Sequence, residues 1–164
     1  MSTLAVDTIT SKAGKPLVNS TGSVLQVVST VQTSQFTSTT SDLAAPTDCM
    51  SATIVPSAES SKILITVNAS LGGSANAIGV NTFLKKNGSL LDVGSGQLGL
   101  LNYGLGRSDG NNINYSMTFL DSPNTVTSTI YTFAIGRYGG SGTAYFRWNI
   151  NKDICTITLM EIAG

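Results

Sequence analysis

The sequence predicts an all-β protein, an antiparallel β-sandwich or jelly roll formed by one domain. Apolar and polar residues alternate in many short runs, with the period of two that a strand imposes on its side chains. The runs recur about every ten residues with turn residues between them, which is typical of sandwiches and jelly rolls. No run shows the apolar spacing of three and four that a helix requires over several turns.

The stretch over residues 49–70 predicts two strands joined by a turn. In its second run Ile63, Ile65 and Val67 fall on one side of the strand, and mainly polar residues fall on the other. Pro56 cannot donate a backbone hydrogen bond, and the serines that follow it compete for local backbone groups. The chain is therefore expected to turn between the two runs.

The other strands follow from the same pattern and from the turn residues between them. Asn87 and Gly88 tolerate the positive φ angles of a tight hairpin, so residues 80–86 and 89–93 are predicted to pair. Residues 94–114 are rich in glycine and predict a long loop with one short strand near 98–103. Further strands are expected over residues 24–36, 115–120, 129–138, 143–149 and 154–162.

The last predicted strand, residues 154–162, is apolar on both sides. Cys155, Ile157 and Leu159 alternate there with Ile154, Met160 and Ile162. The outer face of a sandwich strand is normally polar, so we expect another subunit to cover the second side. We also expect residues 49–55 to pair near this strand, and Leu159→Asp to disrupt assembly as much as folding.

Length and charge restrict the function classes. A chain of 164 residues is long enough for one domain with a sizeable core. Charged residues make up 11% of it, against about 25% in ordinary domains, and the net charge is zero, so we expect much of the surface to be buried in an oligomer. Neither sign of charge is concentrated, which argues against binding to nucleic acid or to an anionic membrane.

The N-terminal segment, residues 1–23, differs from the rest of the chain. It contains glycine, proline and lysine with scattered apolar residues, so it is too polar to fold alone. Two interpretations stand: the segment becomes ordered against a partner, or it is a frayed terminus without a role. It lacks the basic and apolar regions of a signal peptide, and no run approaches the roughly twenty apolar residues of a membrane span, so membrane insertion is not expected.

The residues of common active sites are missing or badly placed. Histidine is absent, which excludes Ser-His-Asp and Cys-His catalysis. Cys49 and Cys155 are expected to be buried thiols rather than a disulfide. The GSGQLG motif lacks the βαβ unit of a nucleotide site, and the polar loop over residues 107–114 fits a turn better than a calcium site. We therefore expect no enzyme activity, no cofactor and no metal.

Aromatic and cationic residues near the predicted loops are candidates for contact with a host surface or glycan. They are Tyr103, Arg107, Tyr138 and Tyr145. Core packing or subunit contacts explain these residues at least as well.

The chain resembles the fibre and spike modules of tailed bacteriophages, especially phages of marine cyanobacteria. Four segments carry the resemblance in this order: SATIVPSAESSKILITVNASLGG, TFLKKNGSLL, LDSPNTVTSTIYTFAIGRYGGSGTAYFRWN and ITLMEIAG. The opening TITSKAGKPLVNSTGSVLQVV resembles the segment that precedes such modules. The resemblance implies a homotrimer with a jelly-roll head, similar in plan to the tumour-necrosis-factor and C1q heads, and a terminal strand near the threefold axis. Candidate trimer-interface residues are then Ile157, Leu159, Met160 and Ile162.

The leading hypothesis is a non-enzymatic virion protein, made in the host cytoplasm. Residues 1–23 would dock on a capsid, portal or tail protein, while residues 24–164 form a trimeric head that projects and contacts the host surface. One alternative is a trimeric decoration protein that cements the capsid. Another is a carbohydrate-binding module that uses the tyrosine and arginine side chains of the loops around 94–114.

Overall fold

The structure is a computed structural model that describes residues 21–74, 79–94, 99–105, 113–139, 141–147 and 153–164. Its regular elements are all strands, which pair antiparallel in two sheets. The first sheet contains β1 (Val24–Gln32), β2 (Phe36–Ser38), β4 (Lys62–Gly73), β8 (Ile113–Asp121), β10 (Ala144–Phe146) and β11 (Cys155–Ile162). The second contains β3 (Thr47–Ile54), β5 (Gly79–Lys86), β6 (Ser89–Leu90), β7 (Leu100–Leu105) and β9 (Thr129–Tyr138).

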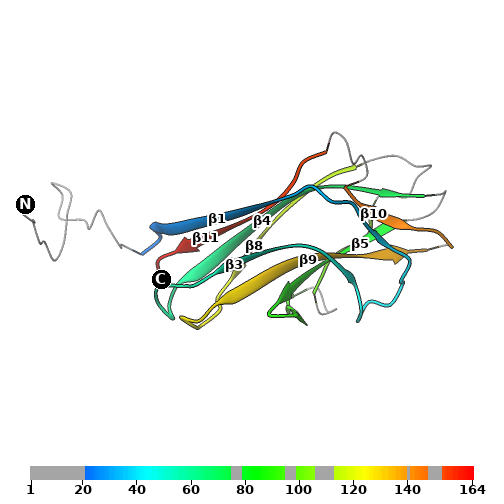
Figure 1. Ribbon diagram of the computed structural model, residues 1–164. Coiled ribbons are helices and arrows are strands. Elements are labelled where there is room, and N and C mark those ends of the chain that lie inside the picture. The colour runs from blue at the N-terminus through cyan, green and yellow to red at the C-terminus, as the bar shows by residue number, and fades with distance from the viewer. Residues whose placement is uncertain (1–20, 75–78, 95–98, 106–112, 140, 148–152) are drawn as a thin grey trace, which may run out of the picture.

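The two sheets face each other as the layers of a sandwich (Figure 1). The long strands of the first sheet follow the order β1-β11-β4-β8, and those of the second follow β3-β9-β5-β7. Among these eight long strands, all that follow one another in the chain lie in opposite sheets except β5 and β7, which pair with each other, and this is the order of a jelly roll. The predicted antiparallel sandwich is confirmed.

The core lies between the sheets and contains the apolar side of each alternating run. Ile63, Ile65 and Val67 of β4 are fully buried, as the alternation predicts. From the second sheet, Tyr131 and Phe133 of β9 pack against the same cluster and are equally buried. Each such side chain stabilises the fold by about 1.5–3 kcal/mol, so this cluster is the main source of stability.

The hairpin between β5 and β6 is confirmed. Asn87 and Gly88 have φ angles of 50° and 81°, as a two-residue type I′ turn requires. The Asn87 side chain also accepts a hydrogen bond from the backbone N–H of Ile130 on β9, at 2.8 Å. The turn is therefore attached to the neighbouring strand as well as closed on itself.

Several strand boundaries differ from the prediction. The first strand breaks after Gln32, because its side-chain Oε1 accepts hydrogen bonds from the N–H groups of the two following residues and turns the chain. The strand expected over residues 143–149 ends at Phe146, since Arg147 has a φ of 57°; residues 148–149 lie outside the described part. β8 begins at Ile113, inside the predicted loop.

The position of β3 corrects the expected pairing of residues 49–55 with the last strand. β3 pairs with β9 in the second sheet, whereas β11 lies between β1 and β4 in the first. β3 and β11 contact each other across the core rather than edge to edge. A run of alternating residues identifies a strand but not its partner, and here the partner comes from jelly-roll topology.

The faces of β11 also correct the prediction. Ile157 and Leu159 are 0% exposed and point into the core, so neither is available to another subunit. Met160 and Ile162 lie on the opposite, outer face and are partly exposed. The outer face also carries two threonines, so β11 is not apolar on both sides. Leu159→Asp is now expected to act on folding alone.

The two ends of the described chain meet at one end of the sandwich. The backbone N–H of Gly22 donates to the carbonyl of Ala163 at 2.7 Å, and the backbone N–H of Ala163 donates to the carbonyl of Ser23 at 2.8 Å. Residues 22 and 23 thus belong to the sandwich edge. The domain boundary after residue 23 stays a prediction.

The two cysteines are buried free thiols, as predicted. Burial raises the pKa of Cys49, and it also raises the pKa of Cys155. Both therefore remain protonated, unreactive side chains of the core. Within the described residues, no helix is long and apolar enough to cross a membrane.

Candidate functional site

The outer face of the first sheet is a broad surface whose side chains no described element covers. We call the outward residues of its four long strands the outer face. On β1 they are Val24, Val27, Ser29 and Val31; on β11, Thr156, Thr158, Met160 and Ile162; on β4, Lys62, Leu64, Thr66 and Asn68; and on β8, Asn114, Ser116, Thr118 and Leu120.

Strand register assembles an apolar row across this face. Val27 pairs with Met160, Met160 with Leu64, and Leu64 with Leu120. The row thus crosses all four strands without a polar residue. Val27 is 56% exposed and Leu120 is 48% exposed. Exposed apolar side chains that are contiguous, rather than scattered, mark contact surfaces.

A second row, composed of hydroxyl side chains, lies beside the apolar row. Its members, Ser29, Thr158, Thr66 and Thr118, are again successive register partners. The hydroxyls of Ser29 and Thr158 are hydrogen-bonded at 2.9 Å. Hydroxyls satisfied in this way cost less to remove from water than charged groups do, so the second row is compatible with burial against a partner.

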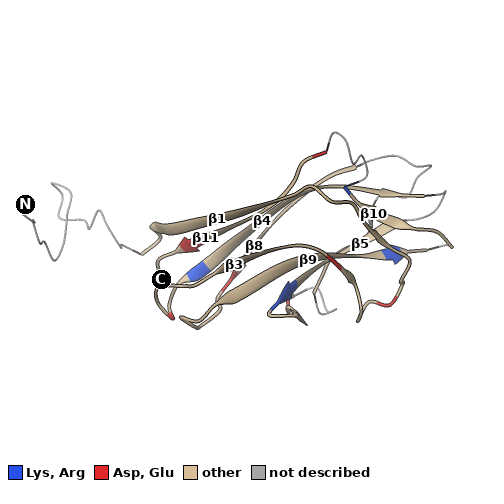
Figure 2. Cartoon of the chain, viewed as in Figure 1, with Lys and Arg blue, Asp and Glu red and all other residues tan. Residues whose placement is uncertain are grey.

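The outer face carries almost no charge. Lys62 is the one charged residue among its members, and it lies at the end of β4 near the chain termini. Figure 2 shows how few positions along the strands of both sheets are charged residues. A surface that lacks charge does not protect a protein against self-association, and it can be buried without leaving unpaired ions.

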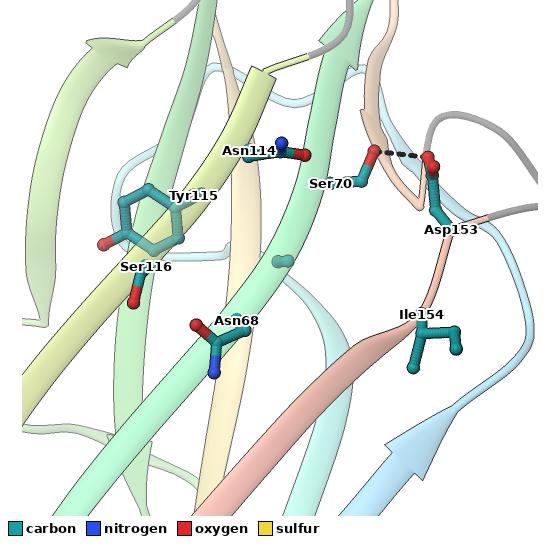
Figure 3. A pocket seen from close by; sticks show the side chains of 8 residues that line it. Asn68, Ser70, Asn114, Tyr115, Ser116, Asp153 and Ile154 are labelled. Atoms are coloured by element: carbon teal, nitrogen blue, oxygen red, sulfur yellow. Dashed lines mark hydrogen bonds between the residues drawn. The ribbon is translucent and has the colours of Figure 1, made fainter.

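A polar pocket of about 450 Å³ opens beyond the hydroxyl row (Figure 3). Asn68 and Ser70 of β4 pair with Ser116 and Asn114 of β8, which places four polar side chains together. Asp153 and Ile154, which precede β11, also line the pocket, as do Ala69 of β4 and Tyr115 of β8. The pocket exists because β11 and β10 pair with different parts of β4 and leave Ala69 and Ser70 between them.

Hydrogen bonds hold one wall of the pocket in place. The Ser70 hydroxyl donates to the Asp153 carboxylate at 2.5 Å, and the Ser70 N–H donates to the Cys155 sulfur at 3.4 Å. The guanidinium of Arg147 donates to the Asp153 carbonyl at 2.9 Å. On the other wall, Asn68, Asn114 and Ser116 are exposed, and no other described side chain bonds theirs.

Glu161 is a buried carboxylate near the end of the sandwich where Gly22 and Ala163 are bonded. It points inward from β11 and is 0% exposed. It accepts hydrogen bonds from the hydroxyls of Ser57 and Ser61, each at 2.6 Å, from the Ser57 N–H at 2.7 Å and from the Gln26 amide at 2.6 Å. Burial alone raises the pKa of this carboxyl, but these bonds outweigh burial and lower the pKa to about 2.

Asp121 forms a second buried network at the edge of the core. Its carboxylate accepts a hydrogen bond from the Tyr131 hydroxyl at 2.6 Å and pairs with the Lys86 ammonium at 2.9 Å. Burial and the adjacent carboxylate both raise the pKa of Tyr131, so the phenol stays protonated and donates. The network joins β8, β9 and β5, and thus the two sheets.

The structure does not bring the four predicted contact residues together as one site. Tyr138 lies at the end of β9 in the second sheet, and Tyr145 lies on β10 in the first; both are partly exposed. Tyr103 belongs to β7, but its side chain lies outside the described part, as does all of Arg107. In the predicted loop over residues 107–114, Ile113 and Asn114 are strand residues, and the others are not described.

Sequence reasoning missed the residues of the polar pocket. The sequence predicts Asn68 on the polar side of a strand and Asn114 in a loop. Only the pairing of β4 with β8 shows that the two residues lie near each other. Among the described residues, no group of three or more cysteine or acidic side chains could hold a metal ion.

No family model matches the chain, and no curated protein matches it. Solved structures of infectious bursal disease virus are similar to it in fold. The structure of the Gx strain has a TM-score of 0.47 at 14% identity over 100% of this chain. The VP2 subviral particle has a TM-score of 0.43 at 12% identity over 85% of it. The chain spans 43% and 38% of the length of those chains.

Proposed function

We propose that this chain is a non-enzymatic structural protein of a virus particle, a homotrimeric fibre or spike of the tailed-bacteriophage type. The resemblance of its segments to such modules is the reason for proposing a virus particle, and the jelly-roll fold is compatible with that proposal. The single observation that carries the proposal is the outer face, a surface with Lys62 as its one charged member and with an apolar row across four strands.

In the proposed trimer the outer faces of three copies surround the threefold axis, with their strands running along it. Threefold symmetry then places the three apolar rows at the same height, where they close into a ring. The hydroxyl rows form a second ring beside it. Of the predicted interface, Met160 and Ile162 keep this role, and Val27, Leu64 and Leu120 join them.

The N-terminal segment is proposed to dock the trimer on another virion protein. Of the predicted docking segment, residues 1–23, Gly22 and Ser23 are bonded to Ala163 of the sandwich, so the residues before them are proposed to make the docking contact. In a parallel trimer, the three N-terminal segments extend from the same end of the assembly. Three linked weak contacts bind far more strongly than one.

Particles purified from the virus that encodes this chain provide the test. Mass spectrometry should detect the chain in the particles, and gold-labelled antibodies should place it on projecting fibres or spikes. Labelling spread over the capsid shell would support the alternative of a decoration protein. Absence of the chain from intact particles would contradict the proposal.

Removal of residues 1–20 tests docking separately. The shortened chain should keep the sandwich and the trimer but should no longer enter particles that lack the full-length chain. Incorporation at the level of the full-length chain would refute docking through this segment.

A further inference from the structure

We infer that Asn87 is a modification site, at which deamidation to aspartate or isoaspartate takes place only when the hairpin between β5 and β6 opens. Asn87 and Gly88 are the one Asn-Gly pair of the sequence, and both residues are exposed. They connect two strands of the second sheet, so they lie away from the outer face of the first. The inference therefore does not depend on the proposed trimer or on a virus particle.

Deamidation at an Asn-Gly pair needs water and no enzyme. The backbone nitrogen of Gly88 attacks Cγ of Asn87, so that a bond forms between these atoms and the bond from Cγ to Nδ2 breaks. Ammonia leaves with the proton that the Gly88 nitrogen gives up. Water then opens the cyclic imide at either of its carbonyls, which gives aspartate or isoaspartate. Glycine favours the attack because no side chain hinders its nitrogen.

The closed turn keeps the attacking nitrogen away from its target. The φ angles of Asn87 and Gly88, 50° and 81°, are those of a type I′ turn, in which ψ of the first central residue is about 30°. At that ψ the Gly88 nitrogen and the Asn87 Cβ lie on nearly opposite sides of the Cα–C bond. The five-membered imide ring requires both on the same side. The reaction therefore needs a rotation of ψ that the closed turn does not allow.

Two hydrogen bonds to β9 oppose this rotation. The Asn87 N–H donates to the Ile130 carbonyl at 2.9 Å, and the Ile130 N–H donates to Oδ1 of Asn87 at 2.8 Å. The first bond holds the Asn87 backbone on β9, and the second holds the side chain that must swing toward Gly88. The observed rate is then the rate of the open chain multiplied by the fraction of hairpins that are open.

Leu91 holds the second arm of the hairpin in place. β6 is only two residues long, so the residue that follows it carries much of the attachment. The Leu91 side chain is 8% exposed and belongs to the core cluster. Its N–H donates to the Leu84 carbonyl at 3.0 Å, and its carbonyl accepts from the Gly99 N–H at 2.6 Å. Loss of the Leu91 side chain should therefore open the hairpin more often.

The two products differ in their effect on the turn. Asp-Gly also forms type I′ turns, and an aspartate at position 87 can still accept the hydrogen bond from the Ile130 N–H. In isoaspartate the main chain runs through Cγ, which adds one carbon atom to the turn. The hairpin then cannot close in its original register, and the change is not reversed by refolding.

Tandem mass spectrometry of the full chain, incubated in slightly alkaline buffer, tests the inference. It follows the exchange of NH₂ for OH at each asparagine with time. Asn87 should deamidate at least about tenfold more slowly in the folded chain than in the chain unfolded by urea. Equal rates in the two states would overturn the inference.

Two variants separate opening of the hairpin from general loss of stability. Leu91→Ala should raise the deamidation rate of the folded chain by about tenfold or more. Leu71→Ala is the matched control, because it removes the same side chain from a fully buried position on β4 of the other sheet. Its rate should stay near that of the wild type, at a temperature at which circular dichroism shows both variants folded. No rise in Leu91→Ala, or an equal rise in both variants, would overturn the inference.

The products provide a second measurement. Hydrogen exchange of the Ile130 amide should be as slow in Asn87→Asp as in the wild type, because the carboxylate replaces the carboxamide as acceptor. In the purified isoaspartate form the same amide should exchange at least about tenfold faster. Equal protection in the isoaspartate form would contradict the predicted opening of the turn.

Discussion

Met160 on β11 and Leu64 on β4 are direct register partners on the outer face of the first sheet. Their sequence neighbours Leu159 and Ile65 pair in the same way on the inner face and are fully buried. The same two strands thus carry apolar pairs on both sides. One pair builds the core, and the other is left for a partner, which we propose to be a second copy of this chain.

The apolar row should be sensitive to charge in a way that an equally exposed residue elsewhere is not. Leu120→Glu places a carboxylate in each row and three carboxylates near one ring, so the trimer should dissociate at micromolar concentration. Ile130→Glu is the matched control, since Ile130 is 42% exposed and lies on the second sheet. Light scattering after gel filtration gives both masses. Equal masses for the two variants would contradict the placement of the apolar row in the trimer interface.

Glu161 should make the fold sensitive to acid. Its carboxyl has a pKa of about 2 in the fold and an ordinary value of 4.5, so the unfolded chain binds the proton more readily. The stabilisation is complete above about pH 4.5 and is lost as the pH falls toward 2. Denaturant unfolding at pH 7 and pH 3 should show this loss in the wild type.

Substitution of Glu161 separates its contribution from that of the other acids. In Glu161→Gln, the new NH₂ group would face the donor groups that the carboxylate accepts from, and it cannot accept their hydrogen bonds. The substitution should therefore lower the free energy of unfolding by about 1–3 kcal/mol at neutral pH. The variant should also lose less stability than the wild type between pH 7 and pH 3. Glu59→Gln removes the same charge from an exposed turn and should change little. An unchanged pH dependence in Glu161→Gln would contradict the assignment.

The bond between Tyr131 and Asp121 should contribute to stability as a charge-assisted hydrogen bond. Tyr131→Phe keeps the buried ring and removes the hydroxyl, with an expected cost of about 1.5–3 kcal/mol. Asp121→Asn and the double variant complete a mutant cycle. The cycle should give a coupling of about 1 kcal/mol or more, and additive effects would mean that the two groups do not interact.

Two glycines with left-handed backbones should tolerate alanine differently. Gly99 and Gly94 have φ angles of 71° and 75°. A Cβ on Gly99 would lie 2.6 Å from Leu90 Cδ2 and 2.9 Å from the Leu84 carbonyl oxygen, whereas a Cβ on Gly94 would meet nothing within 4 Å. Gly94→Ala should cost about 1–2 kcal/mol of backbone strain, and Gly99→Ala should cost about 1–3 kcal/mol more. Thermal unfolding at one protein concentration compares them.

Much of the fold could be predicted because local patterns determine it. The alternation of β4 and the Asn87–Gly88 turn depend on residues close together in the chain, and both are confirmed. The partner of β3 could not be predicted, because strand pairing between distant segments leaves no local pattern. The prediction that β11 is apolar on both sides is wrong because Thr156 and Thr158 share its outer face with Met160 and Ile162.

The candidate site was harder to predict than the fold. The residues of the outer face come from four strands, and those of the pocket from β4, β8 and the residues before β11. Each segment alone shows only a polar or a mixed outer side. The rows and the pocket arise from register, in which a shift of one residue would exchange the faces of a strand.

The most direct test of the central claim is the mass of the full chain in solution, measured by sedimentation equilibrium at micromolar concentration. The proposed assembly predicts one species at three times the chain mass of 17.0 kDa. A single species at 17.0 kDa over the whole concentration range would contradict it.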